Sequence, residues 1–254
     1  NVTYETPLHI EKHIQKDALQ PSYLPVIDSP IMASATGPFG KISTEAQEKT
    51  PSLEAIDVSF RYDVSNDGVN HITFSVEPGE LVALIGQNGA GKTTVTKLVN
   101  GLLRPQDGDV LIMGSSTKPK KISEIARHVS TLFQNPDYQI CKETVLEEVA
   151  FGLELKGIPS KEATERAHKT LEHFNLDPEA SPFLLSRGQR QIVALASVVV
   201  CKPDILILDE PTCGLDYKEC MVVMQAVEEL REKGCAVLMV CHDMEVVSDF
   251  ATRL

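Results

Sequence analysis

The sequence lacks any apolar run long enough to span a bilayer, which takes about 20 residues in a helix. It also lacks the charged start and short apolar core of a signal peptide. We therefore expect that this polypeptide does not itself cross a membrane. Its six cysteines form no C-x-x-C pair and show no metal-like spacing, so we expect reduced, mostly structural thiols in a cytosolic protein.

Basic residues are outnumbered. The chain has 24 Lys and Arg against 36 Asp and Glu, a formal net charge of −12. Because neutralising nucleic-acid phosphates requires clustered positive charge, this balance argues against a general nucleic-acid binder. The 254 residues, 42% hydrophobic and 24% charged, are typical of a globular protein with one or two domains and a sizeable core.

The N-terminal stretch, residues 1–51, differs from the rest of the chain. Repeated prolines interrupt it, it has no sustained hydrophobic period, and Ser, Thr and Gln become frequent towards its end. We predict a linker or an N-terminal extension here, with a short helix near residues 10–19, followed by a domain at 52–254. Since the chain starts with Asn1 rather than Met, we also expect that it is a fragment.

Strand and helix patterns alternate after this stretch. Apolar–polar alternation predicts strands at 53–60 and 71–76, separated by a turn at 66–68. The order indicates antiparallel strands first, then a parallel α/β core with a helical insertion between two of its strands. Further strands are predicted at 81–85, 109–113, 129–133, 205–208 and 236–240, and helices at 93–103, 143–155, 161–174, 187–200 and 218–233.

One stretch, residues 86–93, has the residues that bind phosphate. It fits G-x-x-x-x-G-K-[ST] between a buried strand pattern and a helical pattern. Glycines let backbone N–H groups turn inward, and the following helix aims its positive dipole end at an anion. Lys92 would meet the β- and γ-phosphates, and Thr93 would offer its hydroxyl to Mg²⁺. A glycine-rich turn that binds nothing is the alternative. The predicted nucleotide-binding residues are Gly86, Asn88, Gly89, Ala90, Gly91, Lys92, Thr93 and Thr94.

Two carboxylates follow the apolar strand at 205–208. Ligands of parallel sheets bind at the carboxyl ends of the strands, so Asp209 and Glu210 would lie near the phosphate loop. Asp209 is expected to hold Mg²⁺, and Glu210 to polarise the attacking water. The alternative is an Asp-Glu pair that caps a helix after a core strand.

Residues 185–189, LSRGQ, precede that strand. Together with the phosphate loop and the carboxylates, they resemble the LSGGQ signature of the ATP-binding cassette (ABC) ATPase family. In that family the signature of one subunit caps the ATP held by the other, which implies that Ser186, Gly188 and Gln189 contact the ATP of a second cassette. Arg187 departs from the pattern, and its side chain would either crowd the nucleotide or add a cation beside the γ-phosphate. A helix N-terminus with a Ser cap is the alternative.

The resemblance implies roles for four further residues. Tyr62 corresponds to the aromatic that stacks on adenine, and Asp216 falls in the loop that communicates across the dimer. Without the resemblance, Tyr62 and His242 would be interpreted as packing or structural residues. The implied catalytic residues are Glu210, His242, Gln134 and Lys92, the implied metal ligands are Thr93, Gln134 and Asp209, and the implied cofactors are ATP and Mg²⁺.

The resemblance also implies a fold class. We expect an α/β protein, a P-loop NTPase with a RecA-like parallel sheet core, an N-terminal antiparallel β subdomain and an inserted α-helical subdomain at about 138–185. Residues 133–139 and 144–152 look like the energy-coupling-factor (ECF) branch, whose ATPases drive uptake of vitamins and metal ions. This implies the ATP-hydrolysing subunit of an importer on the cytoplasmic face of the membrane. Substrate choice in such systems lies in the membrane subunits, so the sequence does not reveal the solute.

Two kinds of partner are expected. One is a second cassette, which is identical, separate or fused upstream, since residues 1–51 are similar to the linker of a fused ECF ATPase. The other is a set of transmembrane subunits whose short helices dock on residues 134–151. Tyr138, Ile140 and Val145 in that segment show no evident core role in the sequence pattern.

Two other interpretations remain open. A soluble ABC ATPase acting on ribosomes or DNA is the main alternative. The DNA-repair members need a long coiled coil between phosphate loop and signature, and the segment from Lys92 to Ser186 is too short for one. The acidic balance further weakens a nucleic-acid role. An exporter fused to its membrane domain is the third interpretation, and the missing apolar spans argue against it.

Overall fold

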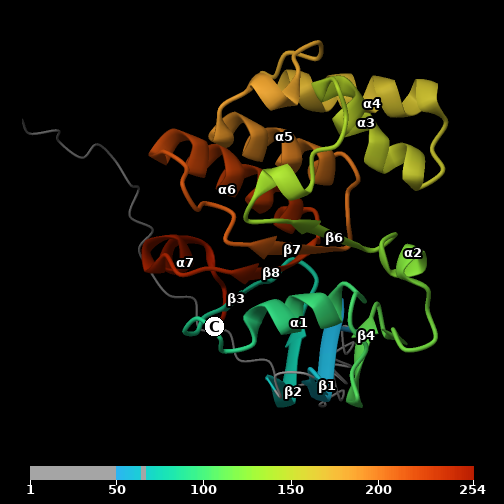
Figure 1. The fold of residues 1–254 in the computed structure, drawn as a ribbon, viewed down its shortest axis with the longest axis vertical. Helices are drawn as coiled ribbons and strands as arrows, with labels where there is room; N and C mark the ends of the chain where they lie inside the picture. The colour runs from blue at the N-terminus through green and yellow to red at the C-terminus, as the bar shows by residue number, and fades with distance from the viewer. Residues whose placement is uncertain (1–49, 64–66) are drawn as a thin grey trace, which may run out of the picture. The chain divides into compact units, whose positions relative to one another are not determined.

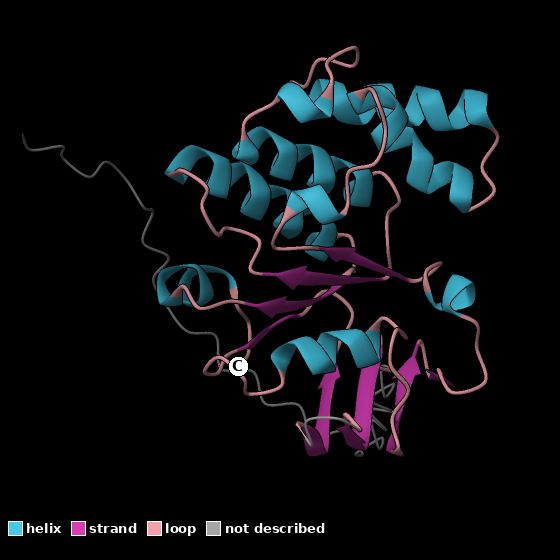
Figure 2. Ribbon diagram, in the orientation of Figure 1, coloured by secondary structure: helices cyan, strands magenta, loops and turns pink. Residues whose placement is uncertain are grey.

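The computed structural model describes residues 50–63 and 67–254, so the helix predicted near residues 10–19 and nearly all of the predicted linker lie outside the described residues. Two four-stranded sheets and their covering helices make up the described part, as predicted for the fold class (Figures 1 and 2). None of the helices within 50–63 and 67–254 combines the length and the apolar character needed to cross a bilayer.

The first sheet is antiparallel, in the order β2-β1-β4-β5, and β1 pairs with both β2 and β4. β2 starts at Gly68 rather than at the predicted residue 71, because Gly68 pairs with Arg61 on β1. A Cβ at Gly68 would lie only 1.9 Å from the carbonyl oxygen of Phe60, so glycine here allows the close approach of two strands. The predicted turn at 66–68 falls partly outside the described residues. The strands are β1 (Leu53–Arg61), β2 (Gly68–Val76), β4 (Asp107–Ile112) and β5 (Ser115–Ser116).

The second sheet is parallel, in the order β3-β8-β7-β6. Three of its strands, β3, β7 and β8, are short apolar runs with buried residues on both faces, as parallel strands require, while β6 has Ser130 and Thr131 at its centre. Because all four strands run the same way, their carboxyl ends meet along one edge. The strands are β3 (Leu81–Leu84), β6 (Val129–Leu132), β7 (Ile205–Asp209) and β8 (Ala236–Val240).

Helices cover the parallel sheet on both faces. Figure 1 shows α1 between the two sheets, and its apolar residues share a core with the antiparallel strands. On the other face α5, α6 and α7 share a core with the alternate residues of the same strands, and α3 and α4 pack on α5 beyond them. The helices are α1 (Lys92–Val99), α2 (Ile122–Ile125), η1 (Pro136–Tyr138), α3 (Val145–Leu155), α4 (Ser160–His173), η2 (Pro182–Leu184), α5 (Arg187–Val199), α6 (Tyr217–Glu232) and α7 (Met244–Phe250).

Two further sequence expectations need correction. The helix that starts in the phosphate loop ends at Val99 rather than near residue 103, because Gly101 adopts a φ of 76° and sits tightly against Ile125. Ile140 and Val145, expected on a docking surface, are instead 6% and 0% exposed and belong to the core that α3, α4 and α5 share. The short elements β5, α2 and α7 were not predicted at all.

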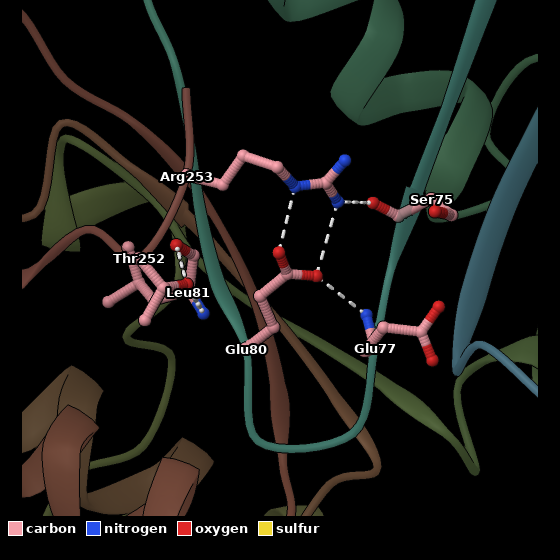
Figure 3. Close-up of polar contacts among 6 residues, drawn as sticks. All are labelled: Ser75, Glu77, Glu80, Leu81, Thr252 and Arg253. Atoms are coloured by element: carbon pink, nitrogen blue, oxygen red, sulfur yellow. Dashed lines mark hydrogen bonds and ion pairs between the residues drawn. The ribbon is translucent and has the colours of Figure 1, made fainter. Parts of the chain in front are cut away.

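The end of the described chain lies along β3, as Figure 3 shows. The N–H of Thr252 donates to the carbonyl oxygen of Leu81 at 2.9 Å, and the N–H of Leu81 donates to the Thr252 hydroxyl at 3.0 Å. Arg253 donates through Nε and Nη2 to the two oxygens of Glu80 at 2.8 and 3.1 Å, and through Nη2 to the Ser75 carbonyl. These bonds fasten the strand that leads into the phosphate loop.

These contacts change the pKa of the Glu80 carboxyl. Partial burial raises its pKa, but the hydrogen bonds from Arg253 and from the Glu77 N–H, together with the Arg253 charge, outweigh burial and hold the pKa below its ordinary value. Glu80 is therefore ionised in the folded protein over a wider pH range than a free carboxyl.

Candidate nucleotide site

The predicted phosphate loop joins the carboxyl end of β3 to the first residue of α1. Gly91 is the N-cap of α1 with a φ of 90°, a conformation that favours glycine. A Cβ there would lie 2.7 Å from Cγ1 of Val69 and 3.2 Å from the carbonyl oxygen of Gly68, so the start of β2 also excludes a side chain. No acidic residue occupies the first turn of α1, which leaves its positive end available to an anion.

A mainly polar cavity of about 360 Å³ opens beside this loop. Its walls come from the start of β2, the phosphate loop, the N-terminus of α1, and the segments that follow or end β6, β7 and β8. A Cβ at Gly89 would meet no other atom within 4 Å, so the backbone there is open to an approaching ligand. The lining residues are Asp67, Gly68, Asn88, Gly89, Gly91, Lys92, Thr93, Thr94, Gln134, Asp209, Glu210, Val240 and His242.

Lys92 is held by its own loop. Its ammonium Nζ donates to the carbonyl oxygen of Gly86 at 2.7 Å and to that of Gln87 at 2.9 Å. The side chain therefore folds back over the loop, where its charge faces the same cavity as the carboxylates of Asp209 and Glu210 at the end of β7.

Asp209 is the last residue of β7 and lines the cavity. Burial and the neighbouring Glu210 carboxylate raise the pKa of Asp209, and the Lys92 charge only partly opposes them. Two adjacent carboxylates and the Thr93 hydroxyl are oxygen donors of the kind that Mg²⁺ prefers. Among the described residues, no three His, Cys, Asp or Glu side chains are arranged to hold a metal ion by themselves. The donor set thus fits a cation that is shared with a bound phosphate.

Glu210 lies between side chains from two other strand ends. Its Oε2 accepts a hydrogen bond of 2.5 Å from Nε2 of Gln134, and its Oε1 lies 3.2 Å from Nε2 of His242. The backbone of Glu210 has a φ of 47°, and its N–H donates to the carbonyl oxygen of Val240 at 2.8 Å. The parallel sheet thus unites three predicted site residues that are far apart in the sequence.

Other predicted residues are not brought to the cavity wall. Gly86 and Ala90 belong to the loop but do not line the cavity. Tyr62 is also absent from the lining, and its ring packs edge-on against Phe60 with the centroids 5.0 Å apart. It lies next to the cavity, however, because its backbone N–H donates to the carbonyl oxygen of Asp67 at 2.9 Å.

The predicted signature residues form the N-terminus of α5, away from the cavity wall. Ser186 caps the helix, accepting from the N–H of Gln189 at 3.2 Å, and Gln189 returns a side-chain bond to the N–H of Ser186 at 3.0 Å. Gly188 is buried, and a Cβ on it would lie 1.9 Å from a carboxylate oxygen of Glu219. A side chain here would therefore displace the Glu219 carboxylate, which accepts a hydrogen bond from the N–H of Asp216 at 3.1 Å.

Two residues that the sequence did not single out connect these parts. Gln191 is 3% exposed, and its Nε2 donates to the carbonyl oxygens of Phe133 at 3.2 Å and Pro211 at 3.5 Å, just beyond β6 and β7. Arg190 forms an ion pair with Asp137 at 2.8 Å. A polar residue on the buried face of α5 was the available signal for Gln191.

Comparison with known proteins identifies the family. The ABC transporter family model matches residues 69–213. A Methanocaldococcus jannaschii protein named energy-coupling factor transporter ATP-binding protein EcfA is 37% identical over 206 residues, which cover 80% of this chain and 74% of that protein. A Caldanaerobacter subterraneus protein that bears the name of an ABC transporter ATP-binding protein is 39% identical over 204 residues. This chain spans 36% of that relative's length, and 43% of a similar Methanosarcina mazei relative.

Similarity to solved structures supports the same family. CbiO1 from Clostridium perfringens, described as part of the ABC transporter complex cbiONQ, superposes with a TM-score of 0.71 at 28% identity, over 79% of this chain and 82% of that chain. A dimeric ATP-binding cassette in a post-hydrolysis state, bound to ADP and Pi, gives 0.69 at 28% identity, over 76% and 89%. With the fold, the phosphate loop and these matches together, the chain belongs to the ABC transporter family as an ATP-binding ATPase domain.

Proposed function

We propose that this chain is the ATP-hydrolysing cassette of an importer of the ECF type, which couples hydrolysis to uptake of a vitamin or metal ion. The observation that carries hydrolysis is the Glu210 carboxylate, held between Gln134 and His242 opposite the phosphate loop. The similarity to EcfA and to CbiO1 supports the importer assignment.

In this proposal each group of residues that lines the cavity has a separate role in ATP binding or hydrolysis. The loop amides and Lys92 bind the phosphates, and Glu210 accepts a proton from the water that attacks the γ-phosphate. The hydrogen bond from Gln134 fixes one oxygen of the base, and His242 lies at the other, where it steadies the γ-phosphate. Tyr62, beside the cavity, is positioned for contact with adenine.

Mg²⁺ would be held by Thr93, Asp209 and Gln134. When bound, it neutralises charge on the β- and γ-phosphates. Burial and the neighbouring Glu210 carboxylate raise the pKa of Asp209. Both carboxylates line the cavity with Lys92, whose single positive charge does not balance them. A divalent cation would relieve that excess of negative charge.

A second cassette completes the proposed site. Ser186 and Gln189 are exposed at the N-terminus of α5, outside the cavity of their own chain, so they are available to the ATP of another cassette. Gly188 lies between them and is buried, and its proposed contact is with the same ATP. The dimeric neighbour and the longer relatives support such a pair. The second cassette is an identical chain, a separate protein or an upstream half of the same protein.

The membrane partner is proposed to dock at a groove of about 620 Å³ between α2 and β6 on one side and α3 and α5 on the other. Tyr138, in η1 near this groove, is 83% exposed. Docking there would place this chain at the cytoplasmic face of the membrane. Groove residues include Arg127, Phe133, Gln139, Phe151, Leu155 and Cys201.

Co-purification tests this assignment. The tagged chain is isolated from detergent-solubilised membranes of its own cells, with Tyr138→Glu as the matched variant. We expect integral membrane proteins to accompany the unaltered chain and to be depleted with Tyr138→Glu. Recovery of ribosomes or DNA with both, and of no membrane protein, would instead support the soluble ABC ATPase.

A further inference from the structure

Arg187 is an exposed residue whose guanidinium contacts its own chain. Its guanidinium lies over Gly214, where a Cβ would be 3.1 Å from Nη1, 3.3 Å from Cζ and 3.8 Å from Nε. Three atoms of the planar group are thus close to one backbone position. The Arg187 side chain makes no hydrogen bond or ion pair within the described residues, so this contact is one of packing.

Gly214 belongs to the loop that follows the candidate base. The N–H of Cys213 donates to the carbonyl oxygen of Glu210 at 3.2 Å, and Asp216, at the other end of the loop, caps α6. Gly214 has a φ of 74°, so a side chain here would be strained as well as crowded by the arginine. The loop 213–216 therefore lies under the guanidinium.

The same helical turn also fastens two neighbouring loops. Positions 187, 190 and 191 fall on one side of α5, as residues three and four apart do. Arg190 pairs with Asp137 beyond β6, and Gln191 binds the backbone at both strand ends. Arg187 adds the third connection of this turn, to the loop 213–216.

We propose that Arg187 is a positioning residue that holds the loop 213–216 against the N-terminus of α5 within its own cassette. The planar guanidinium covers Gly214, and the departure from the family signature serves this contact rather than the nucleotide of the second cassette. The proposal rests on the proposed function only in naming that second cassette. The contact itself is made without nucleotide or partner.

Hydrogen exchange of the backbone amides at 213–216 tests this in the complete chain without nucleotide. Arg187→Ala is expected to speed exchange there roughly fivefold, equivalent to about 1 kcal/mol of lost protection. Arg187→Lys keeps the charge but not the planar group, so it should not restore protection. Arg166→Ala, which removes an exposed arginine on α4, is the matched control and should leave 213–216 unchanged. Rates are compared with the amides of β1, which carries none of these substitutions, so a globally destabilised variant is recognised by faster exchange in both segments.

The outcomes separate the two proposals. Unchanged exchange at 213–216 in Arg187→Ala, or full protection in Arg187→Lys, would overturn the positioning role. Gly214→Ala gives a second variant, and it should also speed exchange in the loop, because its methyl is strained at a φ of 74° and is crowded by the guanidinium. None of these measurements involves ATP hydrolysis or a membrane protein, so their failure leaves the transport proposal standing, and the reverse is also true.

Discussion

Replacing Glu210 by Gln removes a charge with almost no change in shape. Both oxygens of the carboxylate face nitrogen groups, Nε2 of Gln134 and Nε2 of His242. A glutamine can accept from only one of them, and its NH₂ meets the other. The backbone conformation is unaffected, because glutamine tolerates the φ of 47° as well as glutamate does.

The expected effects on rate and affinity differ. Loss of a positioned base lowers hydrolysis roughly 10²- to 10⁴-fold, or about 3 to 5 kcal/mol in activation free energy. ATP affinity should stay equal or increase, because the phosphates rest on Lys92 and the loop amides and one negative charge leaves the cavity. Without the Glu210 charge, the pKa of Asp209 should also move back towards its ordinary value, which favours cation binding.

Steady-state phosphate release and nucleotide titration measure the two effects separately. Glu165→Gln, at an exposed position of α4, is the matched control and should retain the rate of the unaltered protein. A Glu210→Gln protein that hydrolyses ATP at full rate would remove Glu210 from the role of base. A protein that loses hydrolysis and ATP binding together would show that the carboxylate is structural.

Three further predictions concern other parts of the molecule. Lys92→Ala should weaken ATP binding roughly tenfold to a hundredfold and slow hydrolysis, and unchanged affinity in a titration would refute the phosphate-loop assignment. Tyr138→Glu should abolish solute uptake in vesicles while ATPase of the isolated chain persists, and normal uptake would place the membrane partner elsewhere. Arg253→Ala should lower the melting temperature by about 2–4 °C near neutral pH. Because the pKa of Glu80 is depressed in the folded state, that difference is present above the ordinary carboxyl pKa and should shrink as pH falls through the lowered value, so a constant difference in acid melts would contradict it.

Much of the site could be predicted because its residues follow the carboxyl ends of strands in one parallel sheet. Buried apolar runs identified β7 and β8, the Val, Leu and Phe of 129–133 identified β6, and the carboxyl ends of parallel strands share one edge. Gln134, Glu210 and His242 therefore meet although long stretches of chain separate them. The roles given to these residues stay predictions.

Contacts made by irregular segments could not be predicted. Residues 134–144 have no hydrophobic period, so the sequence did not show that Ile140 turns under α3 and α5 while Tyr138 stays exposed. The direction of Arg187 depends on Gly214, a residue from a different loop, and no local pattern connects the two. Short elements such as α2 and α7 are fixed by tertiary packing rather than by propensity.

Because Lys92 already donates hydrogen bonds within its own loop, phosphate binding exchanges those hydrogen bonds for new ones. Two of the three ammonium hydrogens already have acceptors, the carbonyl oxygens of Gly86 and Gln87. When a phosphate binds the Lys92 ammonium, charged phosphate oxygens replace these carbonyl oxygens as hydrogen-bond acceptors. The measured binding enthalpy is therefore the difference between the new hydrogen bonds to phosphate and the hydrogen bonds lost within the loop. The same carbonyls can take the ammonium back when the terminal phosphate leaves. Release of the product then leaves the Lys92 ammonium hydrogen-bonded rather than unpaired. This lowers the free-energy cost of returning the loop to its nucleotide-free state.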